Sequence, residues 1–208
     1  MTVYPAINCK DAECVKERLL KAKEFLPEGS WIHIDISDPE YSNIESFFDE
    51  EVFKEWASYF KFEGHLMIPR ERLLEEKWFS GVLKRILVHA DQVDDWDALL
   101  DRARSADVEV GVAVSPKESD VRIPEAVSII EVLAVPPGPS GQSFDTDALS
   151  TLSQLRRAYP RATLLVDGGV DENTGLLSKQ ARADVLVSGS YIWNSSDPPV
   201  AYQTLASI

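Results

Sequence analysis

The 208-residue sequence predicts an α/β fold, a single-domain (β/α)8 or TIM barrel that spans residues 1–208. Short apolar runs alternate with amphipathic helical stretches eight times along the chain, and no linker or change of composition separates a second domain. Runs such as TLLV and DVLV are apolar almost throughout, which is typical of parallel strands covered on both faces. Eight such units favour a closed barrel over an open sheet, although this length requires short loops and some minimal helices.

The elements of the first half follow from apolar spacing and from turn residues. After the first apolar run, Val15, Leu19 and Ala22 recur at the spacing of a helix, and the turn at residues 27–29 ends it. Pro69 lies near the start of a later helix, where its missing N–H is harmless. The expected order is strand 3–8, helix 12–25, strand 31–36, helix 44–60, strand 63–68, helix 69–79, strand 85–89 and helix 96–105.

The second half continues the same alternation. Ser115 and Pro116 end the fifth strand, and the stretch up to Ala126 leaves room for only a short helix. The loop PPGPSGQ follows the sixth strand. The expected order is strand 108–114, a short helix between residues 116 and 126, strand 129–135, helix 146–159, strand 163–166, helix 172–180, strand 185–187 and a weak helix 200–206.

Charge and composition narrow the classes of partner and the compartment. The formal net charge of -14 argues against nucleic acid or an anionic membrane as a partner, because both require a basic footprint. The start, MTVYPAIN, lacks a basic segment followed by an apolar core, and no apolar run approaches the ~20 residues that span a bilayer. Cys9 and Cys14, the only cysteines, are expected to be reduced thiols. We therefore expect a cytoplasmic protein.

Two histidines and two aspartates lie at the ends of separate predicted strands. His33 and Asp35 are in WIHID, His65 is in GHLMI and Asp167 is in LLVDGG. His33 is two residues before Asp35, so strand alternation directs both side chains to the same face. Each alone has an ordinary explanation, such as a helix cap or a core histidine. Because the active site of such a barrel lies at the carboxyl ends of its strands, the four together predict an enzyme with a divalent metal and an acid/base pair.

Glycine-bearing loops follow the last three predicted strands. They are residues 138–142, Gly168 with Gly169, and residues 188–190. Glycine lets the backbone approach a ligand closely and direct N–H groups toward it. Barrels frequently hold a phosphate at the loops after the seventh and eighth strands, and no P-loop or dinucleotide fingerprint is present. We therefore expect a phosphorylated small molecule as the substrate.

These motifs resemble those of the ribulose-phosphate 3-epimerases. WIHIDISD, HLMI, PPGPSGQSF, LLVDGGV and VLVSGS occur in the same order and at similar spacing as in that family, from Pro5 to about Trp193. The resemblance implies a (β/α)8 barrel of the ribulose-phosphate-binding type. It also implies an isomerase of the pentose phosphate pathway that converts D-ribulose 5-phosphate to D-xylulose 5-phosphate. Family members form dimers and larger rings, so it implies a homo-oligomer too.

The resemblance further implies roles for individual residues. His33, Asp35, His65 and Asp167 would bind one divalent metal ion, with no organic cofactor. This donor set suits Zn, Fe, Mn or Co alike. Asp35 and Asp167 would also be the catalytic acid/base pair. The residues that would lie around the substrate and its phosphate are Met67, Gly138, Ser140, Gly141, Gly168, Gly169, Gly189 and Ser190.

The implied roles are chemically consistent with one another. The proton at C3 of the sugar is α to the C2 ketone, so its removal gives an ene-diolate, whose charge a metal stabilises as a Lewis acid. Two carboxylates on opposite faces of C3 can exchange roles, one removing a proton and the other returning one. Inversion requires both, because a single base would tend to restore the original configuration.

The chain departs from the family pattern in the expected wall of the pocket. Ala6 stands where the family usually has serine, and Leu133 stands where it usually has methionine. Ser37 opens a segment, residues 37–43, that replaces the usual Met-Asp-Gly, aromatic residue and Val-Pro-Asn. Of three methionines that typically line the reacting carbons, Met67 remains. None of these changes removes an expected metal ligand or carboxylate.

Other functions stay open at this point. The altered segment is compatible with a 3-epimerase of a hexulose 6-phosphate, of the allulose 6-phosphate type. The same changes are compatible with a catalytically silent phosphosugar-binding barrel. A phosphate-binding barrel of another pathway would leave the two histidines and two aspartates unused. His89, at a further strand end, is expected to support the site or the core.

Overall fold

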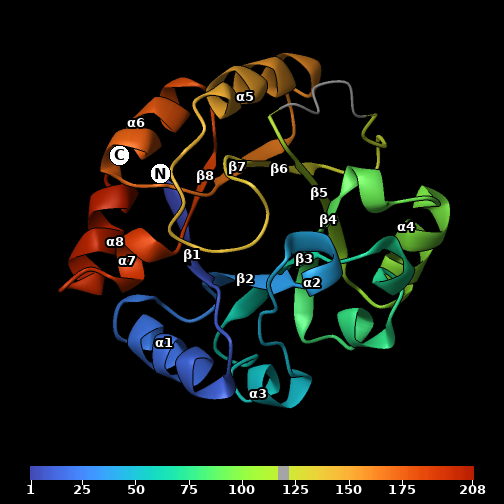
Figure 1. Ribbon diagram of the computed structural model, residues 1–208, viewed down its shortest axis with the longest axis horizontal. Coiled ribbons are helices and arrows are strands. Elements are labelled where there is room, and N and C mark those ends of the chain that lie inside the picture. The colour runs from blue at the N-terminus through green and yellow to red at the C-terminus, as the bar shows by residue number, and fades with distance from the viewer. Residues whose placement is uncertain (117–121) are drawn as a thin grey trace. The chain divides into compact units, whose positions relative to one another are not determined.

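The computed structural model describes residues 1–116 and 122–208. Eight parallel strands are hydrogen-bonded in chain order into a closed barrel, which confirms the predicted fold class (Figure 1). Every strand begins and ends within two residues of its predicted range. The strands are β1 (Thr2–Ile7), β2 (Trp31–Ser37), β3 (Lys61–Met67), β4 (Leu83–His89), β5 (Glu109–Val114), β6 (Ile129–Leu133), β7 (Thr163–Asp167) and β8 (Val185–Ser188).

The chain divides into two compact units. The early unit comprises residues 6–111, and the late unit comprises residues 1–5 together with residues 112–208. The expectation of one domain over residues 1–208 stays a prediction. In the part of the chain that the structure describes, no helix is long and apolar enough to cross a membrane.

Helix α1 (Ala12–Phe25) of the early unit has the bounds that the sequence predicts. The Asp11 carboxylate caps it by accepting a hydrogen bond from the Cys14 N–H at 2.9 Å. Val15, Leu19 and Ala22, which recur at helical spacing, are fully buried. Helix α4 (Trp96–Ser105) also has its predicted bounds, and Asp95 caps it in the same way. Capping and apolar spacing together are therefore sufficient to place both helices.

Two predicted helices of the early unit are wrong in extent. The stretch 44–60 contains only the short α3 (Glu50–Lys54), because its first residues are fixed as a loop against β2. The Ser46 hydroxyl donates to the Asp35 carbonyl at 2.6 Å and accepts from the Ser37 N–H at 2.8 Å. In addition, the Phe47 N–H donates to the Cys9 carbonyl at 2.7 Å. The apolar spacing of this stretch serves core packing and not a long helix.

The stretch 69–79, also expected to be a helix, holds only the 3-10 turns η1 (Arg70–Arg72) and η2 (Glu76–Phe79). The Trp78 indole N–H donates to the Arg72 carbonyl at 2.7 Å, which occupies an acceptor that a helix would use. Trp78 itself is 1% exposed. Burial of this large ring therefore outweighs helix formation here. Within the early unit, two further short elements that the sequence did not predict are α2 (Pro39–Ser42) and η3 (Ala90–Gln92).

The late unit carries its helices on the outer side of its strands, as the orange and red ribbons of Figure 1 show. Asp171 and Thr174 form a reciprocal capping box at the start of α6. The short helix expected between residues 116 and 126 falls partly on residues 117–121, outside the described residues, and residues 122–126 are not helical. The helices are α5 (Asp147–Ala158), α6 (Glu172–Gln180), α7 (Ser190–Trp193) and α8 (Pro198–Ala206).

The expectation of reduced thiols is wrong, because Cys9 and Cys14 are joined by a disulfide. Cys9 lies two residues after the end of β1, and Cys14 is in the first turn of α1. The loop between them turns back so that their Cα atoms are 5.8 Å apart, within the usual range for a disulfide. A spacing of five residues in the sequence does not reveal this turn.

Candidate active site

Three of the four predicted metal ligands meet in the early unit. His33 and Asp35 project from the same face of β2, and the parallel register places Asp35 directly opposite His65 of β3. The Asp35 Oδ1 atom lies 3.3 Å from Nε2 of His33 and 3.5 Å from Nδ1 of His65. All three residues are buried, and their candidate ligand atoms lie within 4.8 Å of one another. Two imidazole nitrogens and a carboxylate oxygen are a donor set that fits a divalent transition metal.

The Asp35 carboxylate is held in its ionised form. Burial would raise its pKa, but hydrogen bonds and charge interactions with His33 and His65 outweigh burial and hold that pKa well below the usual range. The other carboxylate oxygen, Oδ2, accepts from the Asn8 side-chain amide at 3.2 Å. Asn8 is in turn held by Arg18, which donates to its carbonyl at 3.1 Å. An ionised carboxylate of fixed orientation can act as a ligand or as a base.

Asp167, the fourth predicted ligand, lies in the late unit, where it ends β7 and is 8% exposed. Gly168 and Gly169 follow it with positive φ angles of 94° and 64°, which L side chains rarely adopt. A Cβ atom on Gly168 would lie 2.5 Å from Cγ2 of Val135, and one on Gly169 would lie 2.5 Å from the Phe144 nitrogen. Glycine is therefore required at both positions.

The remaining predicted phosphate residues of the late unit lie in the loops after β6 and β8. The loop after β6 is tied to the β7 end, because the Ala134 N–H donates to the Asp167 carbonyl at 2.7 Å. Gly138 and Gly141 of that loop have positive φ angles. Gly189 and Ser190, after β8, begin the short α7. All of these residues, and Ser140 between the two glycines, are at the carboxyl ends of their strands, where the sequence predicts them.

The departures from the family pattern have defined places. Ala6 is opposite His33 in the pairing of β1 with β2, and Leu133 is opposite Asp167 in the pairing of β6 with β7. Ser37 is opposite Met67, and its hydroxyl lies 3.9 Å from the Met67 sulfur. The altered segment that begins at Ser37 is an ordered turn of helix, α2, capped by Asp38. These changes therefore alter the surroundings of the predicted ligands and leave the ligands in place.

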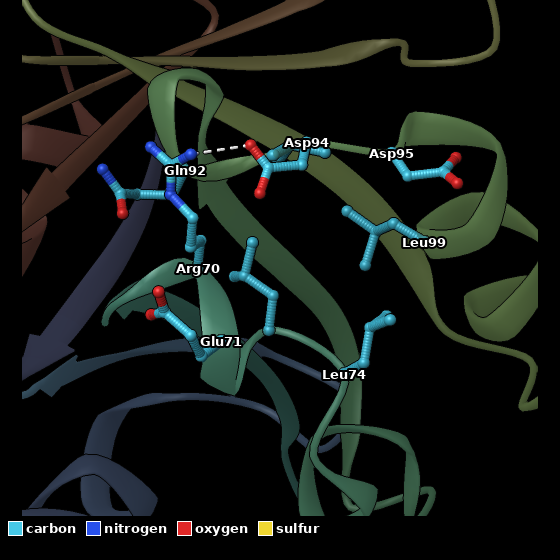
Figure 2. A pocket seen from close by; sticks show the side chains of 9 residues that line it. Arg70, Glu71, Leu74, Gln92, Asp94, Asp95 and Leu99 are labelled. Atoms are coloured by element: carbon cyan, nitrogen blue, oxygen red, sulfur yellow. Dashed lines mark hydrogen bonds and ion pairs between the residues drawn. The ribbon is translucent and has the colours of Figure 1, made fainter.

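A pocket of about 260 Å³ lies elsewhere in the early unit, beside η1 and the start of α4 (Figure 2). An ion pair between Arg70 and Asp94, 2.7 Å long, closes one side of it. Leu74 and Leu99 supply apolar surface. None of the predicted site residues lines this pocket, so it has no part in the predicted chemistry.

The comparisons with known proteins address the family directly. The model of the ribulose-phosphate 3 epimerase family matches residues 3–193. The chain belongs to this family. Among its relatives, the ribulose-phosphate 3-epimerase of Schizosaccharomyces pombe is 28% identical over 191 residues, which cover 84% of this chain and 80% of the relative. That of Chlamydia pneumoniae is 29% identical over 204 residues, which cover 93% of this chain and 88% of the relative.

As a member of the ribulose-phosphate 3-epimerase family, the chain is an enzyme of the isomerase class. Solved structures confirm the fold alone. A 3-hexulose-6-phosphate synthase from Salmonella typhimurium matches with a TM-score of 0.69 at 17% identity, and the match covers 100% of this chain and 97% of the synthase.

Around the predicted ligands, this epimerase-family chain has buried polar residues that include His89, which the sequence predicts to support the site or the core, and Glu63 and Arg85, which the sequence analysis missed. Glu63 lies 2.9 Å from His33, Arg85 donates to Glu63 at 2.6 Å, and His89 lies 2.9 Å from His65. Glu63 and Arg85 are buried charged residues of strands β3 and β4. Strand alternation is a signal that could have found Glu63, because it lies two residues before His65 and therefore on the same face of β3.

Proposed function

We propose that this enzyme inverts C3 of a pentulose 5-phosphate, converting D-ribulose 5-phosphate to D-xylulose 5-phosphate. Its family supports epimerisation of a pentulose phosphate. The observation that carries the finer proposal is the convergence of His33, Asp35 and His65 on one buried point of the early unit. With Asp167, these residues would hold one divalent metal ion, Zn, Fe, Mn or Co, and no organic cofactor is required.

Asp35 suits the role of a base at C3. Its carboxylate is buried and fixed by His33, His65 and Asn8, so it can take a proton without first being reoriented. The C3 proton is α to a ketone, so its removal gives an ene-diolate. When bound, the metal would supply Lewis-acid stabilisation of the negative charge that develops on the sugar oxygens.

Asp167 is proposed as the partner acid. Inversion requires a second group that returns a proton to the face opposite the one from which Asp35 takes it. Asp167 supports this role by its place at the carboxyl end of β7, since the reacting groups of such barrels come from the carboxyl ends of several strands. The two aspartates would exchange roles in the reverse reaction.

The proposed phosphate site uses the loops after the last three strands. Gly168 and Gly169 lie so close to Val135 and Phe144 that no side chain fits there, and glycine loops of this kind commonly bind anions through backbone N–H groups. Met67 would contact the sugar from the end of β3. The proposed phosphate residues are Gly138, Ser140, Gly141, Gly168, Gly169, Gly189 and Ser190. A homo-oligomer stays an expectation from the family, and gel filtration tests it.

The two-carboxylate chemistry is tested with Asp35→Asn and Asp167→Asn. Each should lower the turnover of D-ribulose 5-phosphate by about 10²- to 10⁴-fold, the usual contribution of a general acid or base. Metal content is measured on the same samples, together with exchange of the C3 hydrogen in D₂O. Asp38→Asn is the matched control, because Asp38 caps α2 and pairs with Arg72 at the same strand end. That variant should retain activity.

Three results would contradict the proposal. Retained activity in either Asp35→Asn or Asp167→Asn would exclude a pair of carboxylates. A preference for allulose 6-phosphate over D-ribulose 5-phosphate would make the enzyme a hexulose-phosphate epimerase. A protein that stays inactive and metal-free after addition of Zn, Mn, Fe and Co would be a silent phosphosugar-binding barrel.

A further inference from the structure

A chain of buried ions runs from the surface of the early unit to the back of His33. The Glu63 Oε1 atom lies 2.9 Å from Nδ1 of His33, and Oε2 accepts from Nη1 of Arg85 at 2.6 Å. Arg85 also donates through Nε to Glu109 at 2.7 Å. Glu63 is 0% exposed and Arg85 is 7% exposed. Arg85 further lies over the Trp31 ring, 4.3 Å from its centroid.

This ion chain is unusual for its surroundings. Its two buried members occupy strands β3 and β4, next to Phe62 and Ile86, which are themselves fully buried. Removal of a carboxylate and a guanidinium from water is costly, and apolar residues of similar size at such positions often stabilise a fold equally well or better. Stability alone therefore does not explain why charges stand here.

The hydrogen bonds assign the two nitrogens of His33. An ionised carboxylate can only accept hydrogen bonds, so Nδ1 of His33 must donate to Glu63. Because Nδ1 keeps its proton for Glu63, Nε2, which faces Asp35 at 3.3 Å, is the nitrogen that can present a lone pair to a metal ion. Histidines that bind metals commonly donate their other N–H to a carboxylate, which fixes the tautomer and the ring plane.

We propose that Glu63 is a positioning residue that presents Nε2 of His33 to the metal, and that Arg85 holds Glu63 in place. This inference rests on the proposed metal site. Arginine suits the role because its planar fork donates to two separate carboxylates at once, Glu63 through Nη1 and Glu109 through Nε. Lysine would carry the same charge but lacks this fork.

Glu63→Gln tests the proposal, since glutamine keeps the size of the side chain and can present an amide instead of two acceptors to His33 and Arg85. Metal-free protein is titrated with Co²⁺ alone, whose absorption spectrum reports its ligand geometry. The affinity should fall by about 10- to 100-fold, with a changed spectrum. Long-range ¹H–¹⁵N NMR of the metal-free protein should show the proton of His33 on Nδ1 in the parent chain and a changed tautomer in the variant.

One control variant and one measurement on the parent chain separate this inference from the general loss of a carboxylate and from the metal site itself. Glu75→Gln, which removes a carboxylate that pairs with Arg72, should leave Co²⁺ affinity unchanged. If the parent chain binds no Co²⁺, the proposed metal site is wrong, and the His33 tautomer still tests the positioning role. Equal affinity and an unchanged tautomer in Glu63→Gln would overturn the inference. If that variant does not fold, Arg85→Lys decides in its place, with weakened Co²⁺ binding expected and unchanged binding as the contrary result.

Discussion

The two histidines proposed as metal ligands are supported in different ways. His33 is backed by charges, because Glu63 and Arg85 form a buried ion pair behind it. His65 is backed by a second imidazole, with Nε2 of His89 2.9 Å from its own Nε2. The planes of the His65 and His89 rings differ by 24°. Tyr41 also packs against His89, with the two ring centroids 5.1 Å apart.

This difference determines how strictly each ring is specified. A carboxylate only accepts, so it allows one tautomer of His33. An imidazole can donate or accept, so the hydrogen bond between His65 and His89 forms with the proton on either ring. Burial and the neighbouring His65 lower the pKa of His89 well below the usual value, which keeps His89 neutral. His33 is therefore a rigidly assigned ligand and His65 an adaptable one.

The largest expected effect on stability is at the Glu63–Arg85 ion pair behind His33. Arg85→Met leaves the Glu63 carboxylate buried without its cation, and removal of one partner of a buried ion pair costs about 3–5 kcal/mol. Urea unfolding of the metal-free variant measures the loss. The double variant Glu63→Leu with Arg85→Met removes both charges and should recover most of the stability, but not the affinity for Co²⁺. Recovery of both would mean that the ion pair has no role beyond the fold.

An intermediate effect on stability is expected at His89, the imidazole behind His65. His89→Phe removes the hydrogen bond to Nε2 of His65 and keeps a buried ring, which should cost about 1–3 kcal/mol of stability. Co²⁺ affinity should fall by about 10-fold, the lower end of the usual effect of such a partner. The same urea unfolding and Co²⁺ titration are used. A loss of Co²⁺ affinity larger than that of Glu63→Gln would mean that His65 depends more strongly on its partner than His33 does.

The smallest effect is expected at the outer end of the ion chain. The Glu109 side chain is 43% exposed, so Glu109→Gln should change the free energy of unfolding by less than about 1 kcal/mol. Co²⁺ affinity should change little, because Arg85 still pairs with Glu63. If this variant weakens Co²⁺ binding as much as Glu63→Gln does, Glu109 is as important for positioning His33 as the buried pair is.

The strand pattern is what the sequence predicts well. Apolar runs placed all eight strands, since burial on both faces leaves a continuous signal. Alternation along β2 correctly placed His33 and Asp35 on one face, and the rule that strand ends meet at one end of a barrel correctly grouped His65 with them. The roles of these residues, and of Asp167, stay proposals.

Non-local contacts account for what the sequence did not reveal. Apolar spacing over residues 44–60 predicts a helix, but Ser46 ties its first part to the backbone of β2. The ion pair of Glu63 with Arg85 joins two strands, and neither residue indicates its partner by spacing. The disulfide likewise depends on how the loop from Cys9 to Cys14 turns. In each case the deciding interaction is between segments whose proximity exists only after folding.

The two glycines after β7 limit how this enzyme can diverge. At Gly29 the surroundings are open and only the φ angle of 81° matters, so asparagine, which tolerates that angle, is an accessible substitution. At Gly168 and Gly169 the backbone angle and the clash with Val135 or Phe144 act together, so relief of one constraint leaves the other. A side chain at either position is therefore expected to strain this loop in two ways at once. Sequence divergence in this loop is therefore expected at positions other than these two.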